Sequence, residues 1–173
     1  MMIKTNPLSV KDIEMIAKRF RKNYNIDEDS YFPVLDVIDE MFVKNLLSYQ
    51  IVEDDYHLLD KDTPALYNAY ENVIYIKDSV HEECENNIYR SCFTLCHEIF
   101  HYIQSEVLSF NFEKCEMCKS YEEVDWQANE FAGQLLIPTK YLDLPDDILE
   151  KKFHVSLECV LTRKANAKKR QKK

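Results

Sequence analysis

The first forty residues show the spacing of two amphipathic helices. Ile13, Ala17 and Phe20 recur at helical spacing, and Ser9 stands where an N-cap is expected. A second helix is predicted from Pro33, a residue that suits a first helical turn, because apolar residues follow it at the same spacing. We expect both helices to pack their apolar faces over the sheet that follows.

Three short stretches, residues 46–52, 65–70 and 73–76, are rich in β-branched and aromatic side chains and are separated by polar segments. They predict the strands of a small antiparallel sheet. Glu71 and Asn72 are expected to turn the last hairpin.

From residue 88 to residue 104 the pattern becomes that of a helix that is apolar nearly all round, which is typical of a central, buried helix. Another helix is predicted over residues 121–137, where Pro138 ends it, and one or two short helices over residues 148–163. The single glycine, Gly133, falls inside the 121–137 helix and is predicted to serve close packing and not a hinge.

Composition indicates a folded chain. Hydrophobic residues make up 46% and charged residues 31% of its 173 residues, a balance that fits one globular domain. We expect a single domain over residues 1–163 and a basic, flexible tail over residues 164–173. No apolar run approaches the roughly 20 residues that span a bilayer.

The N-terminal sequence, the cysteines and the net charge indicate the compartment of the protein and the kinds of partner it can bind. The first residues lack the apolar core of a signal peptide, so we expect a cytoplasmic protein whose six cysteines stay thiols. Cys115 and Cys118 have the spacing of half a structural zinc site, but no second pair lies nearby, which favours a loop with two thiols. The net charge of -9 opposes affinity for nucleic acid, and we do not expect DNA binding by the basic tail.

A metal-binding motif lies within the predicted 88–104 helix. His97 and His101 are four residues apart, so both imidazoles leave one helix face and can reach one Zn²⁺ ion. Glu98 stands about a quarter-turn round, where a general base would be needed. The alternative, a chance match in a buried helix, would leave these polar groups desolvated without partners, at a cost of several kcal/mol.

A hydrolytic zinc site has three protein ligands, and the 121–137 helix offers Asp125 and Glu130. Asp125 lies at the edge of the apolar stripe of that helix, whereas Glu130 falls with Gln127 and Gln134 on a stripe expected to face water. We therefore predict Asp125 as the third ligand. Asn129, one turn later, is expected to accept the free N–H of a ligand imidazole. The alternative is that Asp125 only favours the start of its helix.

Together these blocks resemble the ImmA/IrrE-type metallopeptidases, bacterial and phage proteins related to the gluzincins. The resemblance is carried by residues 93–102 (FTLCHEIFHY) and 125–132 (DWQANEFA), with weaker likeness in residues 73–76 and 153–156. In that family a glutamate usually stands where this chain has Asp125, and it supplies the third zinc ligand. With the shorter side chain, either the second helix approaches more closely or the metal is held less tightly.

The resemblance implies an α+β, zincin-like single domain, in which a small antiparallel or mixed sheet and flanking helices pack on the HExxH helix. It also implies a zinc-dependent endopeptidase that cleaves a helix-turn-helix repressor or related regulator of a mobile element or stress response. The residues leave a second reading open, a binding or regulatory protein that keeps the fold without cleaving. For the oxyanion-stabilising group, Tyr102, Tyr141 and His154 are all candidates.

Overall fold

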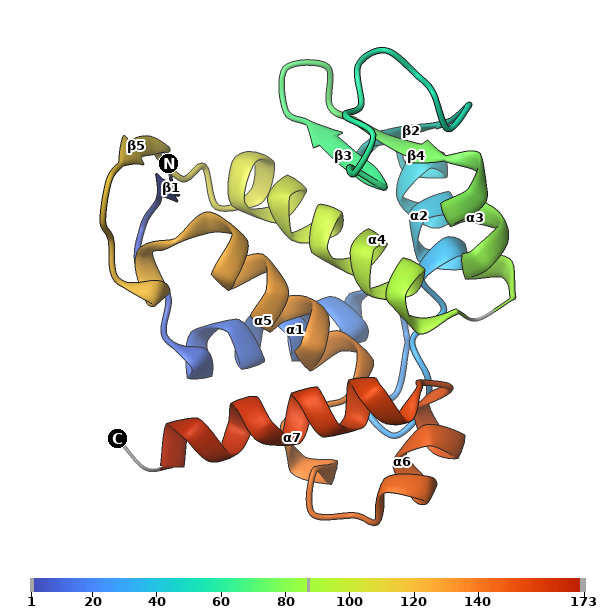
Figure 1. Cartoon of the computed structure of the whole chain (residues 1–173), viewed down its shortest axis with the longest axis vertical. Helices are drawn as coiled ribbons and strands as arrows, with labels where there is room; N and C mark the ends of the chain where they lie inside the picture. Colours follow the sequence, from blue (N-terminus) through green and yellow to red (C-terminus); the bar gives the residue numbers. More distant parts are fainter. Residues whose placement is uncertain (1, 87, 172–173) are drawn as a thin grey trace.

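The computed structural model describes residues 2–86 and 88–171, and its elements surround one central helix, α4 (Figure 1). The helices are α1 Val10–Asn23, α2 Val34–Val43, α3 Asp78–Glu85, α4 Tyr89–Tyr102, α5 Val124–Leu136, α6 Asp146–Phe153 and α7 Leu157–Gln171. The strands are β1 Met2–Lys4, β2 Ser48–Val52, β3 Ala65–Asn68, β4 Val73–Lys77 and β5 Glu113–Cys115. The fold is therefore the expected α+β domain.

The three-stranded sheet is mixed. Its order is β2-β4-β3, with β3 antiparallel and β2 parallel to β4. The antiparallel expectation holds for the β3–β4 hairpin, where Asn72 adopts a left-handed backbone conformation that asparagine tolerates (φ 54°). It is wrong for β2, because the chain between β2 and β4 makes a long excursion through β3 and returns in the same direction, a parallel pairing that no local turn signal reveals.

Helix α1 begins as predicted but packs elsewhere. Ser9 Oγ accepts the backbone N–H of Asp12 at 3.2 Å, and the Asp12 carboxylate accepts the N–H of Ser9 at 2.9 Å, which forms a capping box. Its apolar face lies on α5, where Phe20 meets Phe131 edge to face at 5.8 Å. The expectation that α1 covers the sheet is wrong, because α4 and α5 lie between them; of the two predicted helices, α2 is the one that packs on β2.

A two-stranded sheet that the sequence pattern did not predict holds the start of the chain. β1 pairs antiparallel with β5, and the next residues continue the contact through Thr5 N–H to Glu122 O at 2.7 Å and Leu8 N–H to Tyr121 O at 3.0 Å. The N-terminal segment thus lies along the connection from α4 to α5. Three-residue strands are too short to give a periodic signal.

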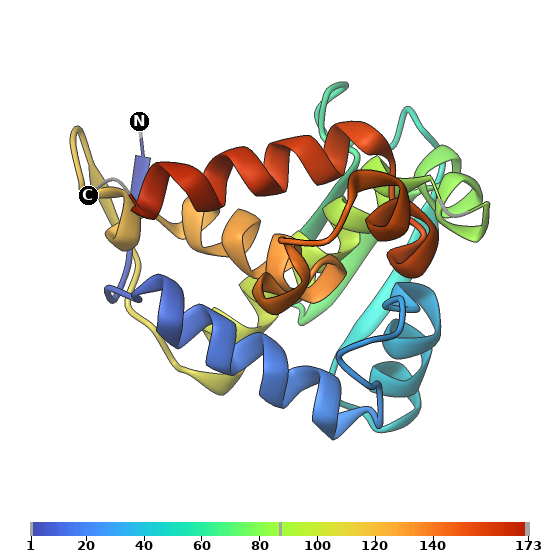
Figure 2. The same ribbon diagram turned by 90° about the horizontal axis from the view of Figure 1, so that it is seen from below.

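Helix α5 is buried on almost every side, which corrects the predicted water-facing stripe. Gln127, Glu130 and Gln134 have exposed fractions of 0%, 6% and 2%. Figure 2 shows α5 between α1 and α7, and α7 contributes Arg163, whose Nη1 lies 3.4 Å from Glu130 Oε1. A Cβ on Gly133 would lie 3.2 Å from Arg163 Cδ, so this glycine occupies a close-packed position.

The stretch expected to be a flexible tail is largely helical. Helix α7 runs to Gln171, and residues 172–173 of the predicted tail lie outside the described residues. Alanine, lysine, arginine and glutamine are good helix formers, and no glycine or proline interrupts them, so the helix continues past Arg163. Among the described residues, no helix combines the length and apolar character needed to cross a membrane.

Arg21 joins α1 to the end of α5. It is 1% exposed, and its guanidinium donates to the backbone carbonyls of Leu135, at 3.0 Å from Nε, and of Asp27 and Ser30, at 2.8 and 3.2 Å from Nη1. Burial lowers the pKa of Arg21 to about 10, which still leaves the side chain charged at neutral pH. The guanidinium therefore satisfies the carbonyl of Leu135, one of the last four of α5, which has no partner within the helix.

Replacing Arg21 by methionine should lower the free energy of unfolding by roughly 2 to 4 kcal/mol, because the buried carbonyl of Leu135 and the partly buried carbonyls of Asp27 and Ser30 lose their donor. Urea unfolding followed by circular dichroism measures the change. Lys22→Met, an exposed position on the same helix, is the matched control and should change stability by less than about 0.5 kcal/mol. Equal effects of the two substitutions would contradict this role.

Candidate metal centre

Three side chains of α4 form the centre of the candidate site. His97, Glu98 and His101 offer ligand atoms that lie within 4.8 Å of one another. The helix is held in place by side chains that are fully buried on its other faces, among them Leu95, Ile99 and Phe100. Phe100 stacks on Phe131 of α5 with ring centroids 4.6 Å apart, which fixes the two helices against each other.

The two imidazoles point their Nε2 atoms at each other at a distance of 2.8 Å. Their other nitrogens face amide oxygens: His97 Nδ1 lies 2.9 Å from Asn129 Oδ1, and His101 Nδ1 lies 3.0 Å from Gln104 Oε1. An amide oxygen only accepts, so in both rings the hydrogen belongs on Nδ1. Two Nε2 lone pairs then face one another, an arrangement that is stable only with a cation or a proton between them.

Asp125 of α5 completes a triangle with the histidines. Its Oδ1 lies 3.7 Å from His97 Nε2 and 3.5 Å from His101 Nε2. Tetrahedral zinc with bonds of about 2.0 to 2.1 Å places its ligand atoms about 3.3 Å apart, and the three observed separations bracket that value. The side chain of Asp125 is 70% exposed, so the third corner of the triangle opens to solvent. The donor set of two imidazoles and one carboxylate fits zinc.

Asp125 has a short side chain, so α5 has to lie close to α4, and small residues on α5 allow this. Ala128 and Ala132 are fully buried, and they stand three and seven residues after Asp125, a spacing that places them on the same face of α5. Small side chains let two helix backbones approach each other, which brings a residue at the start of α5 toward the middle of α4.

Glu98 is held beside the histidines but is turned toward the sheet. Its carboxylate is buried, and Oε2 accepts the backbone N–H of Tyr67 in β3 at 2.7 Å. Burial raises the pKa of Glu98 to about 7, although the positive charge of His97 and the Tyr67 hydrogen bond lower it. A carboxyl group with a pKa near neutrality can both take and return a proton.

The histidines differ in their protonation. Burial alone would lower the pKa of His97, but the neighbouring Asp125 carboxylate and the charge of Glu98 outweigh burial and raise it. Burial and the charge of His97 lower the pKa of His101 to about 4. The His97 ring beside Asp125 lowers the pKa of that carboxyl group, although partial burial opposes the shift. The two rings therefore differ in basicity, with the more basic imidazole beside Asp125.

The structure brings together all five residues predicted for the site, namely His97, Glu98, His101, Asp125 and Asn129. The three oxyanion candidates are dispersed. Tyr102 is buried with its ring edge to face against Tyr67 at 6.0 Å, Tyr141 packs on Phe153 at 5.4 Å, and His154 stacks on Tyr31 at 4.4 Å.

Two site residues were missed. Gln104 stands three residues after His101, a spacing that places it on the same helix face and could have revealed it. The backbone N–H of Tyr67 could not have been found, because only the tertiary structure places β3 beside α4.

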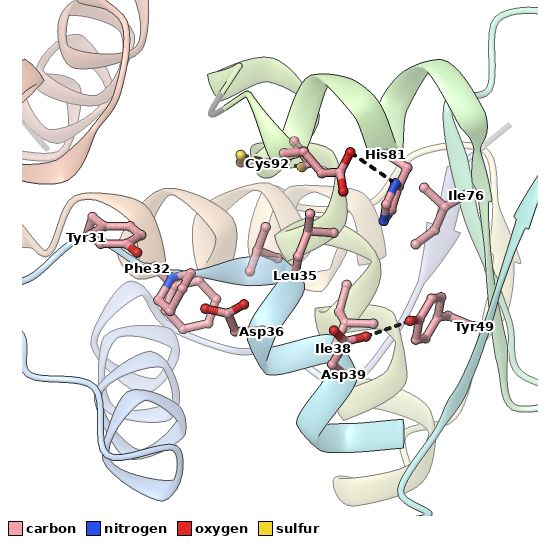
Figure 3. A pocket seen from close by; sticks show the side chains of 14 residues that line it. Tyr31, Phe32, Leu35, Asp36, Ile38, Asp39, Tyr49, Ile76, His81 and Cys92 are labelled. Atoms are coloured by element: carbon pink, nitrogen blue, oxygen red, sulfur yellow. Dashed lines mark hydrogen bonds and ion pairs between the residues drawn. The ribbon is translucent and has the colours of Figure 1, made fainter. Parts of the chain in front are cut away.

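A separate pocket of about 470 Å³ lies between α2, α3 and the sheet (Figure 3). Its wall includes the Tyr49 hydroxyl, which donates to Asp39 at 2.6 Å, and the thiols of Cys84 and Cys92, which lie 3.4 Å apart. None of the five predicted site residues lines it.

Comparison with known proteins gives the family of the chain and a solved structure with a similar fold. Residues 52–163 match the model of a peptidase family described as the IrrE N-terminal-like domain. The chain belongs to this family. No curated protein matches the chain. The fold of this IrrE N-terminal-like domain is similar to a solved Mycobacterium tuberculosis transcriptional regulator, with a TM-score of 0.60 and 18% identity over 87% of this chain. The match covers 45% of the regulator, so this chain spans less than half of its length.

The metal-free protein should become less stable as the pH rises toward the pKa of Glu98 in the folded state. The unfolded state loses this proton near pH 4.5 and the folded state near pH 7, so the stability contributed by protonated Glu98 is full below about pH 4.5 and is lost by about pH 7. With a chelator present, Glu98→Gln should therefore stabilise the protein at pH 8 by roughly 1 to 3 kcal/mol, with a smaller gain at pH 5.

Urea unfolding at both pH values tests this expectation. The control is Glu158→Gln, which neutralises an exposed carboxylate on α7 and should give the same small change at pH 5 and pH 8. A gain for Glu98→Gln that does not depend on pH would contradict the raised pKa.

Proposed function

We propose that this chain is a zinc-dependent metalloendopeptidase that cleaves a helix-turn-helix repressor or a related transcriptional regulator. The observation that carries the proposal is the pair of Nε2 atoms at 2.8 Å, each aimed at the other by an amide acceptor behind its ring. Membership of a peptidase family supports the reaction class. The specific metal, the catalysis and the substrate are the parts proposed.

The chemistry assigns a role to each side chain. His97, His101 and Asp125 would hold the ion, and Asn129 orients the His97 ring. When bound, zinc supplies Lewis-acid chemistry, which polarises a carbonyl group and makes water acidic enough to react at neutral pH. Glu98 takes the proton of the attacking water and delivers it to the leaving amine. Its Oε2 is anchored on Tyr67, which keeps the carboxyl group in one orientation.

An open pocket beside the site suits a peptide. It has a volume of about 1180 Å³, and its lining includes Asn129, the residue that contacts His97. Its aromatic lining consists of Tyr89, Phe93, Tyr121 and Trp126. Such a surface can bury apolar side chains of an extended substrate.

Two considerations favour a regulator as the substrate. Repressor cleavage is what the resemblance to the ImmA/IrrE-type peptidases implies for this chain, and the structurally similar mycobacterial protein is named as a transcriptional regulator. A protein substrate also suits a third metal corner, Asp125, that is open to solvent. The expected compartment is the cytoplasm, where such regulators act.

Purified protein should contain close to one zinc ion per chain by elemental analysis. His97→Ala and Asp125→Ala should each deplete it, because a site with two of its three protein ligands binds the ion far more weakly. Asp147→Ala, which removes an exposed aspartate on α6, is the control and should leave the zinc content unchanged. No zinc in the wild type, even after zinc is added, would overturn the proposal.

Glu98→Gln should reduce cleavage by about 10² to 10⁴-fold while zinc content stays at the wild-type level, because the substitution removes the proton acceptor and spares the ligands. Cleavage is measured by mass spectrometry on the helix-turn-helix repressor encoded nearest to this chain and on a proteome-derived peptide library. Zinc-loaded wild type that cuts neither would contradict the enzyme and favour a regulatory protein that acts by docking its partner. Cleavage of the library alone would contradict the repressor as the substrate.

A further inference from the structure

Two glutamines are buried behind His101. Gln104 lies in a short π-helical segment, Ile103–Val107, that follows α4, and Gln127 lies on α5; both are 0% exposed. A fully buried amide has to find partners for its two N–H groups and its oxygen, since an unmade hydrogen bond there costs about 1 to 3 kcal/mol. The partners that these two amides find connect them to the metal site.

The orientation of each amide is set by backbone carbonyls. Gln127 Nε2 donates to the carbonyls of Asn6 and Tyr121, both at 2.8 Å. A backbone carbonyl only accepts, so the Gln127 oxygen has to point the other way, where it accepts Gln104 Nε2 at 2.9 Å. Gln104 Nε2 also lies 3.4 Å from the carbonyl of Val124.

These hydrogen bonds leave only the side-chain oxygen of Gln104 to contact His101. With its nitrogen committed to Gln127 and Val124, Gln104 turns Oε1 toward His101 Nδ1 at 3.0 Å. The imidazole can only donate to that oxygen, so its hydrogen stays on Nδ1 and the Nε2 lone pair is free for a metal.

We propose that Gln104 and Gln127 form a relay of positioning residues that locks His101 in its Nδ1–H tautomer and thereby sets the zinc affinity of the site. The inference rests on the proposed function for the identity of the metal. It extends the site to the N-terminal segment, whose Asn6 carbonyl is one end of the relay. The relay transmits orientation and not charge, because neither amide titrates.

Two features of the fold support this assignment. The π-helical turn, closed by Leu108 N–H to Ile103 O at 2.8 Å, keeps Gln104 on the face of His101, and such turns are frequent at functional sites. The pairing of β1 with β5, together with the bonds of Thr5 and Leu8, holds the carbonyls of Asn6 and Tyr121 in place. By contrast, the His97 partner Asn129 is exposed.

The tautomer gives a test that does not require the metal. In chelator-treated wild type at neutral pH, nitrogen NMR of the imidazole should show His101 with its hydrogen on Nδ1. In Gln104→Met, which keeps side-chain length and removes the amide, the signals should shift toward the Nε2–H form. Gln134→Met is the matched control, because Gln134 is equally buried on α5 but contacts Glu130 and Thr139; the tautomer should not change. An Nε2–H form in the wild type would overturn the relay.

Zinc titration of the same proteins tests the effect on affinity. Gln104→Met should weaken zinc binding about tenfold to hundredfold. Gln127→Met should weaken it less, and the double variant no more than Gln104→Met alone, since both act through His101. Gln134→Met should bind zinc as the wild type does. If Gln104→Met does not fold, Gln127→Met and the wild-type tautomer still decide the question.

The outcomes separate this relay from the proposed function. Zinc binding by the wild type that is unchanged in Gln104→Met and Gln127→Met would overturn the relay and leave the metallopeptidase proposal intact. A wild type that binds no zinc would overturn the proposed function, and with it the role of the relay in metal affinity.

Discussion

The structure depends on one constraint, the alignment of two imidazole lone pairs at a separation of 2.8 Å. Neutral imidazoles repel each other in this arrangement, so the protein has to hold both rings from behind until a cation or proton joins them. It does so with amide oxygens, which accept the Nδ1 hydrogens and cannot exchange roles. The remaining features of the site follow from the need to bring those amides, and a carboxylate, to the two rings.

The position of α5 against α4 follows from the side chains that it supplies to the site. The helix has to supply Asp125 to the Nε2 atoms of the histidines, Asn129 to Nδ1 of His97 and Gln127 to Gln104 behind His101. Asp125 and Asn129 lie one turn apart on one face of the helix, whereas Gln127 points away from that face. Asp125 and Asn129 remain exposed, so other segments have to cover the opposite face, which carries Gln127 and Glu130. The N-terminal segment covers Gln127, and α7 covers Glu130 through Arg163.

The sheet contributes through one backbone group. By donating the N–H of Tyr67 to Glu98, the edge strand β3 anchors a buried carboxyl group that burial would otherwise leave protonated over a wider pH range. The sheet thus positions the proton acceptor on one side of α4, and α5 positions Asp125 and Asn129 on the other side.

Much of this was determined by the sequence alone. The spacing of His97, Glu98 and His101 on one helix, the edge position of Asp125, and Asn129 one turn later depend on helical geometry, which is local and regular. The capped start of α1 and the hairpin between β3 and β4 were equally readable, because capping and turn residues act over a few positions.

Tertiary structure decided the rest. Glu130 and Gln127 were assigned to water because amphipathic periodicity assumes one covered face, and only the packing of α7 and the N-terminal segment shows that α5 is covered almost all round. The parallel pairing of β2, the short strands β1 and β5, and the carbonyls of Asn6 and Tyr121 that orient the amide relay join residues far apart in the chain. Such contacts leave no periodic trace in the sequence, since their energy depends on where distant segments meet.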